Sequence, residues 1–306
     1  MTEVPQQRVR GLGDRMTEAP EWYTQAIATE AELGEILVHG ARIATRSWGV
    51  PGGEGIVLVH GGAAHARWWD HIAPLLAAHH RVVALDLSGH GDSDYRPSYR
   101  LDLWAEEVLA AADGFDRPPT IVGHSLGGMV TLRAAALAGH RLNGVIIIDT
   151  PISQAPPEQI AARDKLAFGP KRRYPTREDA MAHFRPVPPQ PILSYVEEYI
   201  ALNSVRESDE GEPGWVWKFD PLVFSRPPVI TDEVLTRLAC WVAFFRAENG
   251  MIDPAMERII YDGLGRVAPV IEIPKAGHHV MLDQPLALVT GIRTLLGVWE
   301  HSLPLQ

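Results

Sequence analysis

Short apolar runs alternate with amphipathic segments along most of the chain. The run at residues 56–59 is continuously apolar, as in a strand that is covered on both faces of a sheet, and further strands are predicted at residues 81–85, 121–122 and 142–148. Between them, residues 68–79, 101–112 and 129–137 have apolar positions at helical spacing. Strands that alternate with helices predict an α/β fold with a mostly parallel central sheet flanked by helices.

The alternation stops after Thr150 and resumes near residue 232. Residues 151–231 are rich in proline and contain several candidate helices, so we expect an inserted, mainly helical cap (lid). Residues 35–150 and 232–306 then form the α/β core, and residues 1–34 form an N-terminal arm with one short helix around 22–32.

Two strands around Gly40 are expected within residues 36–49, and the second part of the core repeats the alternation. A strand at 240–245 precedes a helix at 253–264, and a strand at 267–273 precedes a closing helix at 284–299. Ligands of parallel sheets bind at the carboxyl ends of the strands. His60, Asp86, Ser125 and Asp149 all follow predicted strand ends, so we expect the site there.

Composition narrows the class of protein. The chain has 306 residues, 46% of them apolar, and Cys240 is its only cysteine, so an ordinary core without disulfides is expected. A net charge of -10 argues against binding to nucleic acid or anionic membranes. Residues 1–7 have neither a basic start nor an apolar run, and no stretch approaches the ~20 apolar residues of a membrane span. We therefore expect a cytoplasmic protein without nucleic-acid or membrane partners, for which a homodimer stays open.

Ser125 lies at the centre of a Gly123-x-Ser-x-Gly127 motif between an apolar pair and an apolar helical segment. A strand, a tight turn and a helix are the context in which this motif places a nucleophile. The turn is sharp enough to need small residues two positions before and after the serine. The first amides of the helix that begins at Leu126 then point toward the same spot.

Three further segments support this interpretation. They are His60-Gly61-Gly62 after an apolar strand, Asp86-x-x-Gly89-x-Gly91-x-Ser93 after the next one, and Gly277-His278 followed by Asp283-Gln284-Pro285. In order and spacing, the four segments resemble the α/β-hydrolase family in its capped subgroup. The resemblance covers about residues 35–150 and 232–300.

The resemblance implies a serine nucleophile at Ser125 and a histidine base at His278, with His279 as the local alternative. A serine hydroxyl needs such a base within hydrogen-bond reach, and a third group that orients the base. The resemblance also implies an oxyanion hole made by the backbone N–H groups of Gly62 and Leu126.

The acid is where the sequence departs from the family pattern. The usual position, after the strand at 240–245, holds Gly250. Asp149 follows a sheet strand and is our favoured acid, and Glu248, near the usual position, is the alternative. Asp253 precedes Pro254 and is more typical of a helix cap. A site without any acid would keep its binding but lose several powers of ten in rate.

Other candidate residues follow from their place in the pattern. We expect the substrate to contact His60, Gly61, His124, Trp215 and Trp217, although His60, like His90, can instead tie loops together. Trp215, Trp217 and Phe219 alternate as on a strand, and they offer an apolar wall or simply hold the cap on the core. The chain lacks His-Glu-x-x-His or similar spacing, so we expect no metal and no other cofactor.

These residues favour a serine hydrolase that acts on an ester or lactone of a small apolar molecule through an acyl-enzyme. A carbon–carbon bond hydrolase or a cofactor-free perhydrolase could use the same site, and a non-catalytic small-molecule receptor is the alternative from another class. Dehalogenase and epoxide-hydrolase activities are disfavoured, because those relatives carry an aspartate where Ser125 stands.

Overall fold

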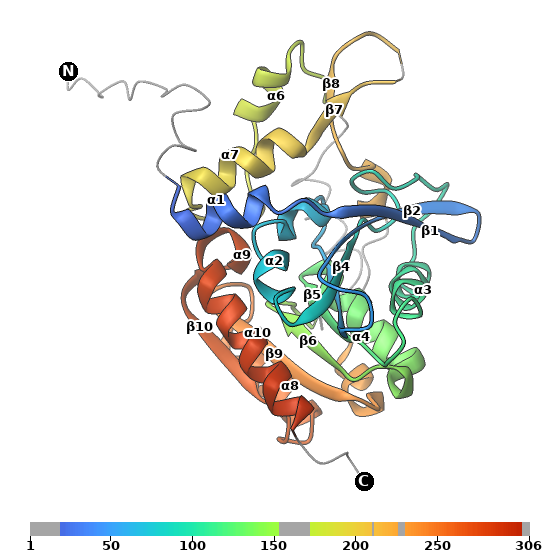
Figure 1. The fold of residues 1–306 in the computed structure, drawn as a ribbon, viewed down its shortest axis with the longest axis vertical. Coiled ribbons are helices and arrows are strands. Elements are labelled where there is room, and N and C mark those ends of the chain that lie inside the picture. The colour runs from blue at the N-terminus through green and yellow to red at the C-terminus, as the bar shows by residue number, and fades with distance from the viewer. Residues whose placement is uncertain (1–18, 153–171, 210, 226–229, 302–306) are drawn as a thin grey trace, which may run out of the picture.

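An eight-stranded sheet forms the centre of the computed structural model, which describes residues 19–152, 172–209, 211–225 and 230–301 (Figure 1). The strand order is β1-β2-β4-β3-β5-β6-β9-β10. The strands are β1 (Glu32–Val38), β2 (Ala41–Trp48), β3 (Glu54–Val59), β4 (His80–Leu85), β5 (Thr120–His124), β6 (Gly144–Ile148), β9 (Trp241–Asn249) and β10 (Val270–Gly277). The β1–β2 and β2–β4 pairs are antiparallel and the other pairs are parallel, so the predicted α/β class is confirmed.

Helices cover both faces of this sheet. Neighbouring residues of each strand point to opposite sides, so each strand contributes apolar side chains to both faces. In β3, Ile56 and Leu58 pack into one apolar cluster while Val57 and Val59 pack into the other. The first cluster includes side chains of α1 (Glu21–Ala28), α2 (Ala73–Leu76), α9 (Val280–Asp283) and α10 (Pro285–Glu300). The second includes side chains of α3 (Leu101–Ala112), α4 (Leu126–Ala138) and α8 (Pro254–Gly263).

Two elements differ from the prediction. The helix expected over 68–79 is split into a 3-10 turn, η2 (Ala66–Trp69), and the short helix α2. Pro74 is tolerated in the first turn of a helix but not in its interior, so the helix begins beside it. Strand β1 begins at Glu32, inside the predicted arm. The sequence did not indicate this start, because the edge strand is mostly exposed and carries no apolar alternation.

The described parts of residues 151–231 lie outside the central sheet. They contain α6 (Arg177–Ala182), α7 (Ser194–Asn203), the antiparallel pair β7 (Val205–Glu207) and β8 (Trp215–Trp217), and the turn η4 (Pro221–Phe224). Figure 1 shows α6, α7, β7 and β8 gathered at one end of the molecule, next to α1. A small sheet therefore accompanies the expected helices, and the limits of the arm, core and cap stay a prediction. Across the described ranges, no helix has the length and apolar character needed to cross a membrane.

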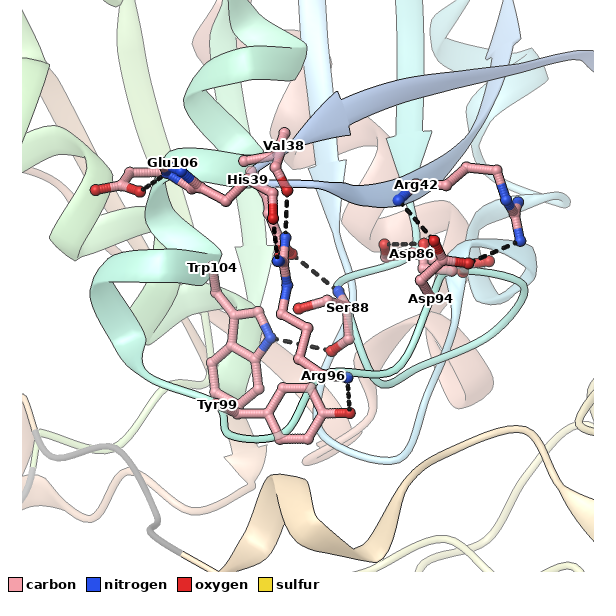
Figure 2. Close-up of polar contacts among 12 residues, drawn as sticks. Val38, His39, Arg42, Asp86, Ser88, Asp94, Arg96, Tyr99, Trp104 and Glu106 are labelled. Atoms are coloured by element: carbon pink, nitrogen blue, oxygen red, sulfur yellow. Dashed lines mark hydrogen bonds and ion pairs between the residues drawn. The ribbon is translucent and has the colours of Figure 1, made fainter.

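A buried ion pair supports the loop between β4 and α3. The guanidinium of Arg96 donates to Glu107 Oε1 at 3.0 Å and to the Val38 carbonyl at 2.7 Å, and the backbone N–H of Ser88 donates to Glu107 Oε2 at 2.9 Å. The Trp104 indole N–H donates to the Ser88 carbonyl at 3.1 Å (Figure 2). Burial raises the pKa of the Glu107 carboxyl, and its bonds to Ser88 and Arg96 oppose that effect.

Replacing Glu107 with alanine should lower the free energy of unfolding by about 3–5 kcal/mol, because it leaves the Arg96 guanidinium buried without its counter-charge. Denaturant titration followed by circular dichroism measures this change. The neighbouring Glu106 pairs with His39 at the surface, so Glu106→Ala is the matched control and should change the stability by less than ~0.5 kcal/mol. Equal losses in the two variants would contradict the assigned role of the buried pair.

Candidate active site

Ser125 occupies the sharp turn between β5 and α4 in a strained backbone conformation, with φ 54° and ψ -117°. The turn leaves no room for side chains at its two glycines. A Cβ on Gly123 would lie 2.3 Å from Thr131 Oγ1, and one on Gly127 would lie 2.4 Å from the His60 carbonyl oxygen. The strand–turn–helix context predicted for the serine is therefore present.

The structure brings Ser125, His278 and Asp149 into one hydrogen-bonded chain. His278 Nε2 lies 3.0 Å from Ser125 Oγ, and His278 Nδ1 lies 2.8 Å from Asp149 Oδ2. Ser125 and Asp149 follow the adjacent parallel strands β5 and β6, and His278 follows β10. A carboxylate at Nδ1 keeps the proton on that nitrogen and leaves the lone pair of Nε2 toward the serine hydroxyl.

The Asp149 carboxylate is fully buried and is held by two backbone amides besides His278. The N–H of Met251 donates to Oδ2 at 2.8 Å, and the N–H of Ala247 donates to Oδ1 at 3.1 Å. A Cβ on Gly250 would lie 2.3–2.6 Å from the carboxyl atoms of Asp149. Glycine at the family's usual acid position thus makes the space that the carboxylate from β6 fills.

The other acid candidates lie elsewhere. Glu248 is exposed, and its Oε2 accepts a hydrogen bond from the backbone N–H of Lys275 at 2.6 Å. Asp253 caps α8, as expected, by accepting from the N–H groups of Ala255 and Met256.

His279 faces the segment before α7 and not the serine. Its Nε2 donates to the Val187 carbonyl at 3.1 Å, and its backbone N–H donates to Gln190 Oε1 at 2.7 Å. Gln190 Nε2 also donates to Asp283 Oδ2 at 3.0 Å. Gln190 thus holds the loop that carries His278, and sequence reasoning missed it because a single polar residue among prolines gives no pattern.

Gly62 and Leu126, the predicted oxyanion residues, lie near each other. The Cβ position of Gly62 is 3.8 Å from Leu126 Cδ2 and 3.1 Å from the ring of Phe224. Leu126 is the first residue of α4, and first-turn N–H groups have no partner inside their helix. Phe224, which the sequence did not single out, covers this corner of the site.

Of the three predicted contact residues, His60 and Gly61 directly follow β3, and His124 ends β5 next to Ser125. His60 donates from Nδ1 to the Gly61 carbonyl at 2.7 Å and accepts at Nε2 from the N–H of Leu87 at 3.0 Å. Both of its ring nitrogens are thereby occupied by the backbone, as expected of a residue that ties loops together, and its contact with substrate stays a prediction. Burial lowers the pKa of His60 to about 4 and keeps the ring neutral. His124 lies against Gly61, with its Nδ1 2.9 Å from that residue's Cβ position, and its Nε2 donates to the His278 carbonyl at 2.9 Å.

Trp215 and Trp217 pack mainly against neighbours from the same inserted region. The Trp217 ring lies 6.3 Å from Phe184, and Phe184 lies 6.3 Å from Trp68 of the core. Trp68 in turn lies 5.4 Å from His279, so Trp217 reaches the histidine loop through a chain of rings. Trp215 lies 5.3 Å from the Arg177 guanidinium. These contacts support the interpretation that the two tryptophans hold the insertion in place.

Known proteins similar to this chain include several hydrolases. Esterase Rv0045c of Mycobacterium tuberculosis is 25% identical in an alignment 271 positions long, which covers 85% of this chain and 88% of the relative. The dihydrolipoyllysine-residue acetyltransferase component of the acetoin cleaving system of Pseudomonas putida is 42% identical, over 83% of this chain and 65% of the relative. The crystal structure of E-2-(acetamidomethylene)succinate hydrolase has a TM-score of 0.75 at 18% identity, over 88% of this chain and all of that one.

The sequence model described as "Alpha/beta hydrolase family" matches residues 56–290, which is more than half of the chain. The match spans the serine turn, the Asp149 strand end and the histidine loop. Sequence, strand order and site geometry therefore lead to one conclusion: this chain belongs to the α/β hydrolase family.

Proposed function

We propose that this protein is a serine hydrolase that cleaves a carboxylic ester or lactone of a small apolar molecule through an acyl-enzyme. The observation that carries the proposal is the unbroken hydrogen-bonded chain from Asp149 through His278 to Ser125. Relatives named as an esterase, a lipase and a pimeloyl-[acyl-carrier protein] methyl ester esterase support ester chemistry. Residues 151–231 would serve as the cap that shapes the substrate pocket.

In the first step, Ser125 Oγ attacks the ester carbonyl carbon while His278 Nε2 takes the hydroxyl proton. The imidazolium that forms is stabilised by Asp149, which is buried and accepts the Nδ1–H bond. Collapse of the tetrahedral intermediate breaks the bond to the leaving oxygen, and His278 returns the proton to it. For a lactone, the leaving oxygen stays attached to the acyl group.

The negative oxygen of the intermediate is received by the backbone N–H groups of Gly62 and Leu126. Each such donor contributes about 3 kcal/mol to transition-state stabilisation. Leu126 opens α4, so the positive end of the helix dipole lies at the same place. In the second step, His278 takes a proton from water, which attacks the acyl-enzyme, and Ser125 recovers its proton.

A carbon–carbon bond hydrolase is the second candidate for the same site. The 2-hydroxy-6-oxo-6-(2'-aminophenyl)hexa-2,4-dienoic acid hydrolase of Metapseudomonas resinovorans is 30% identical over 128 residues, which are 39% of this chain and 43% of that protein. A substrate panel that contains esters, lactones and vinylogous 1,5-diketones of graded size separates the two activities.

A fluorophosphonate probe should label Ser125, because the hydroxyl is activated by His278, and mass spectrometry of the peptides locates the label. Ser125→Ala should abolish labelling and the turnover of short p-nitrophenyl esters. Thr131→Ser is a control that keeps a neighbouring hydroxyl and removes only a methyl group, so it should retain labelling and turnover. A chain that resists the probe and turns over no member of the panel, yet binds apolar ligands tightly, would instead be a receptor.

Asp149→Asn should reduce kcat by about 10⁴-fold, since an amide cannot hold the reactive tautomer of His278. Glu248→Gln should leave kcat within about threefold, because Glu248 bonds to the Lys275 backbone and not to the imidazole. Steady-state kinetics on one ester compares the two variants. A larger loss in Glu248→Gln than in Asp149→Asn would reverse the acid assignment.

A further inference from the structure

Three imidazoles form a compact cluster around the proposed base. The ring centroid of His278 lies 4.8 Å from that of His124 and 4.7 Å from that of His279, and the last two are 5.4 Å apart. One ring nitrogen of each lies within 4.8 Å of those of the other two. All three residues are at least nine-tenths buried.

The hydrogen bonds of each ring decide which nitrogen carries the proton. His124 and His279 each place Nε2 against a backbone carbonyl, which only an N–H can satisfy. Asp149 fixes the proton of His278 on Nδ1 in the same way. Each ring therefore has one unprotonated nitrogen with a lone pair. This nitrogen is Nδ1 in His124 and His279 and Nε2 in His278.

Two of these lone pairs have no hydrogen-bond partner. His124 Nδ1 and His279 Nδ1 are both fully enclosed and unpaired among the described residues. An unsatisfied buried acceptor is destabilising, so two of them beside one reactive group need a physical explanation. Burial, together with the neighbouring imidazoles, keeps the pKa of both rings well below its usual value, so they stay neutral.

We propose that His124, His278 and His279 form a binding site for a divalent transition-metal ion such as Zn²⁺, and that the bound ion inhibits the enzyme. Neutral imidazole nitrogens are preferred ligands of Zn²⁺, Cu²⁺ and Ni²⁺. The ion would take the Nε2 lone pair of His278 that otherwise accepts the Ser125 proton. Inhibition rests on the function proposed above, whereas binding does not.

The surroundings of His278 suit a metal ligand as well as a base. A ligating histidine commonly donates its other N–H to a carboxylate, as His278 does to Asp149. Zn–N bonds of about 2.0–2.1 Å set nitrogens about 3.4 Å apart in a tetrahedral site, so nitrogens that lie within 4.8 Å of one another would have to approach by up to about 1.4 Å. Gln190 and Val187, both in the inserted region, are hydrogen-bonded to His279. A small shift of that segment would let the ring of His279 approach the other two.

A second group, made of Glu54, His80 and Glu300, also brings three possible ligands together. It lies at the opposite ends of the strands, and His80 Nε2 is already paired with Glu300 at 3.1 Å. Both carboxylates are partly exposed, so the attraction of a bound cation is screened by solvent. This group supplies the control for the histidine cluster.

Calorimetric titration of the chelator-treated full chain with Zn²⁺ tests the proposal, with Co²⁺ absorption as a measure of nitrogen coordination. We expect one tightly bound ion per chain. His279→Gln should weaken binding by about tenfold or more, and Asp149→Asn by about 10–100-fold through the lost partner of His278. His80→Gln and Ser125→Ala should keep the affinity within about threefold, and circular dichroism checks that each variant is folded.

The absence of binding up to about 1 mM Zn²⁺ would overturn the proposal. So would binding that is lost in His80→Gln but kept in both His279→Gln and Asp149→Asn, because the ion would then lie at the other group. Zn²⁺ should also inhibit ester turnover with the half-saturation seen by calorimetry, and chelator should restore it. A chain that binds Zn²⁺ at the three histidines but cleaves no ester would refute the proposed function alone.

Discussion

The arrangement of the site depends on one buried carboxylate. Asp149 lies at the end of β6 with no exposure to solvent, and a charge in that place must be matched by donors. The N–H of Ala247 within β9, the N–H of Met251 just after it and the Nδ1–H of His278 supply them. These three hydrogen bonds offset the cost of burying the carboxylate. The one from His278 also fixes the tautomer of that histidine.

Close backbone approach is the second constraint on this centre. The loop after β3, the turn at Ser125 and the segment after β9 meet at the carboxyl ends of parallel strands, where glycines permit contacts that any Cβ would block. Gly127 lies against the His60 carbonyl and Gly250 against the Asp149 carboxyl. Buried His60 then bonds the loops after β3 and β4 to each other, which holds the oxyanion corner in place.

The inserted region and the loop that carries His278 are joined by hydrogen bonds. Gln190 binds the backbone of His279 and the side chain of Asp283, and the N–H of Leu193 donates to the Leu282 carbonyl at 3.1 Å. Movement of this segment would therefore be felt at His278, both as a base and as a metal ligand.

The sequence by itself determined the α/β class and the strand and helix around Ser125, because these follow from local periodicity and from a motif in fixed order. It left the acid open between Asp149 and Glu248, and the base open between adjacent His278 and His279. The contacts that favour Asp149 and His278 exist only in the tertiary structure, since these bonds join residues more than a hundred positions apart. Gln190, Phe224 and the cluster of three imidazoles likewise emerge only when distant strand ends converge, because such contacts leave no period or spacing in the chain.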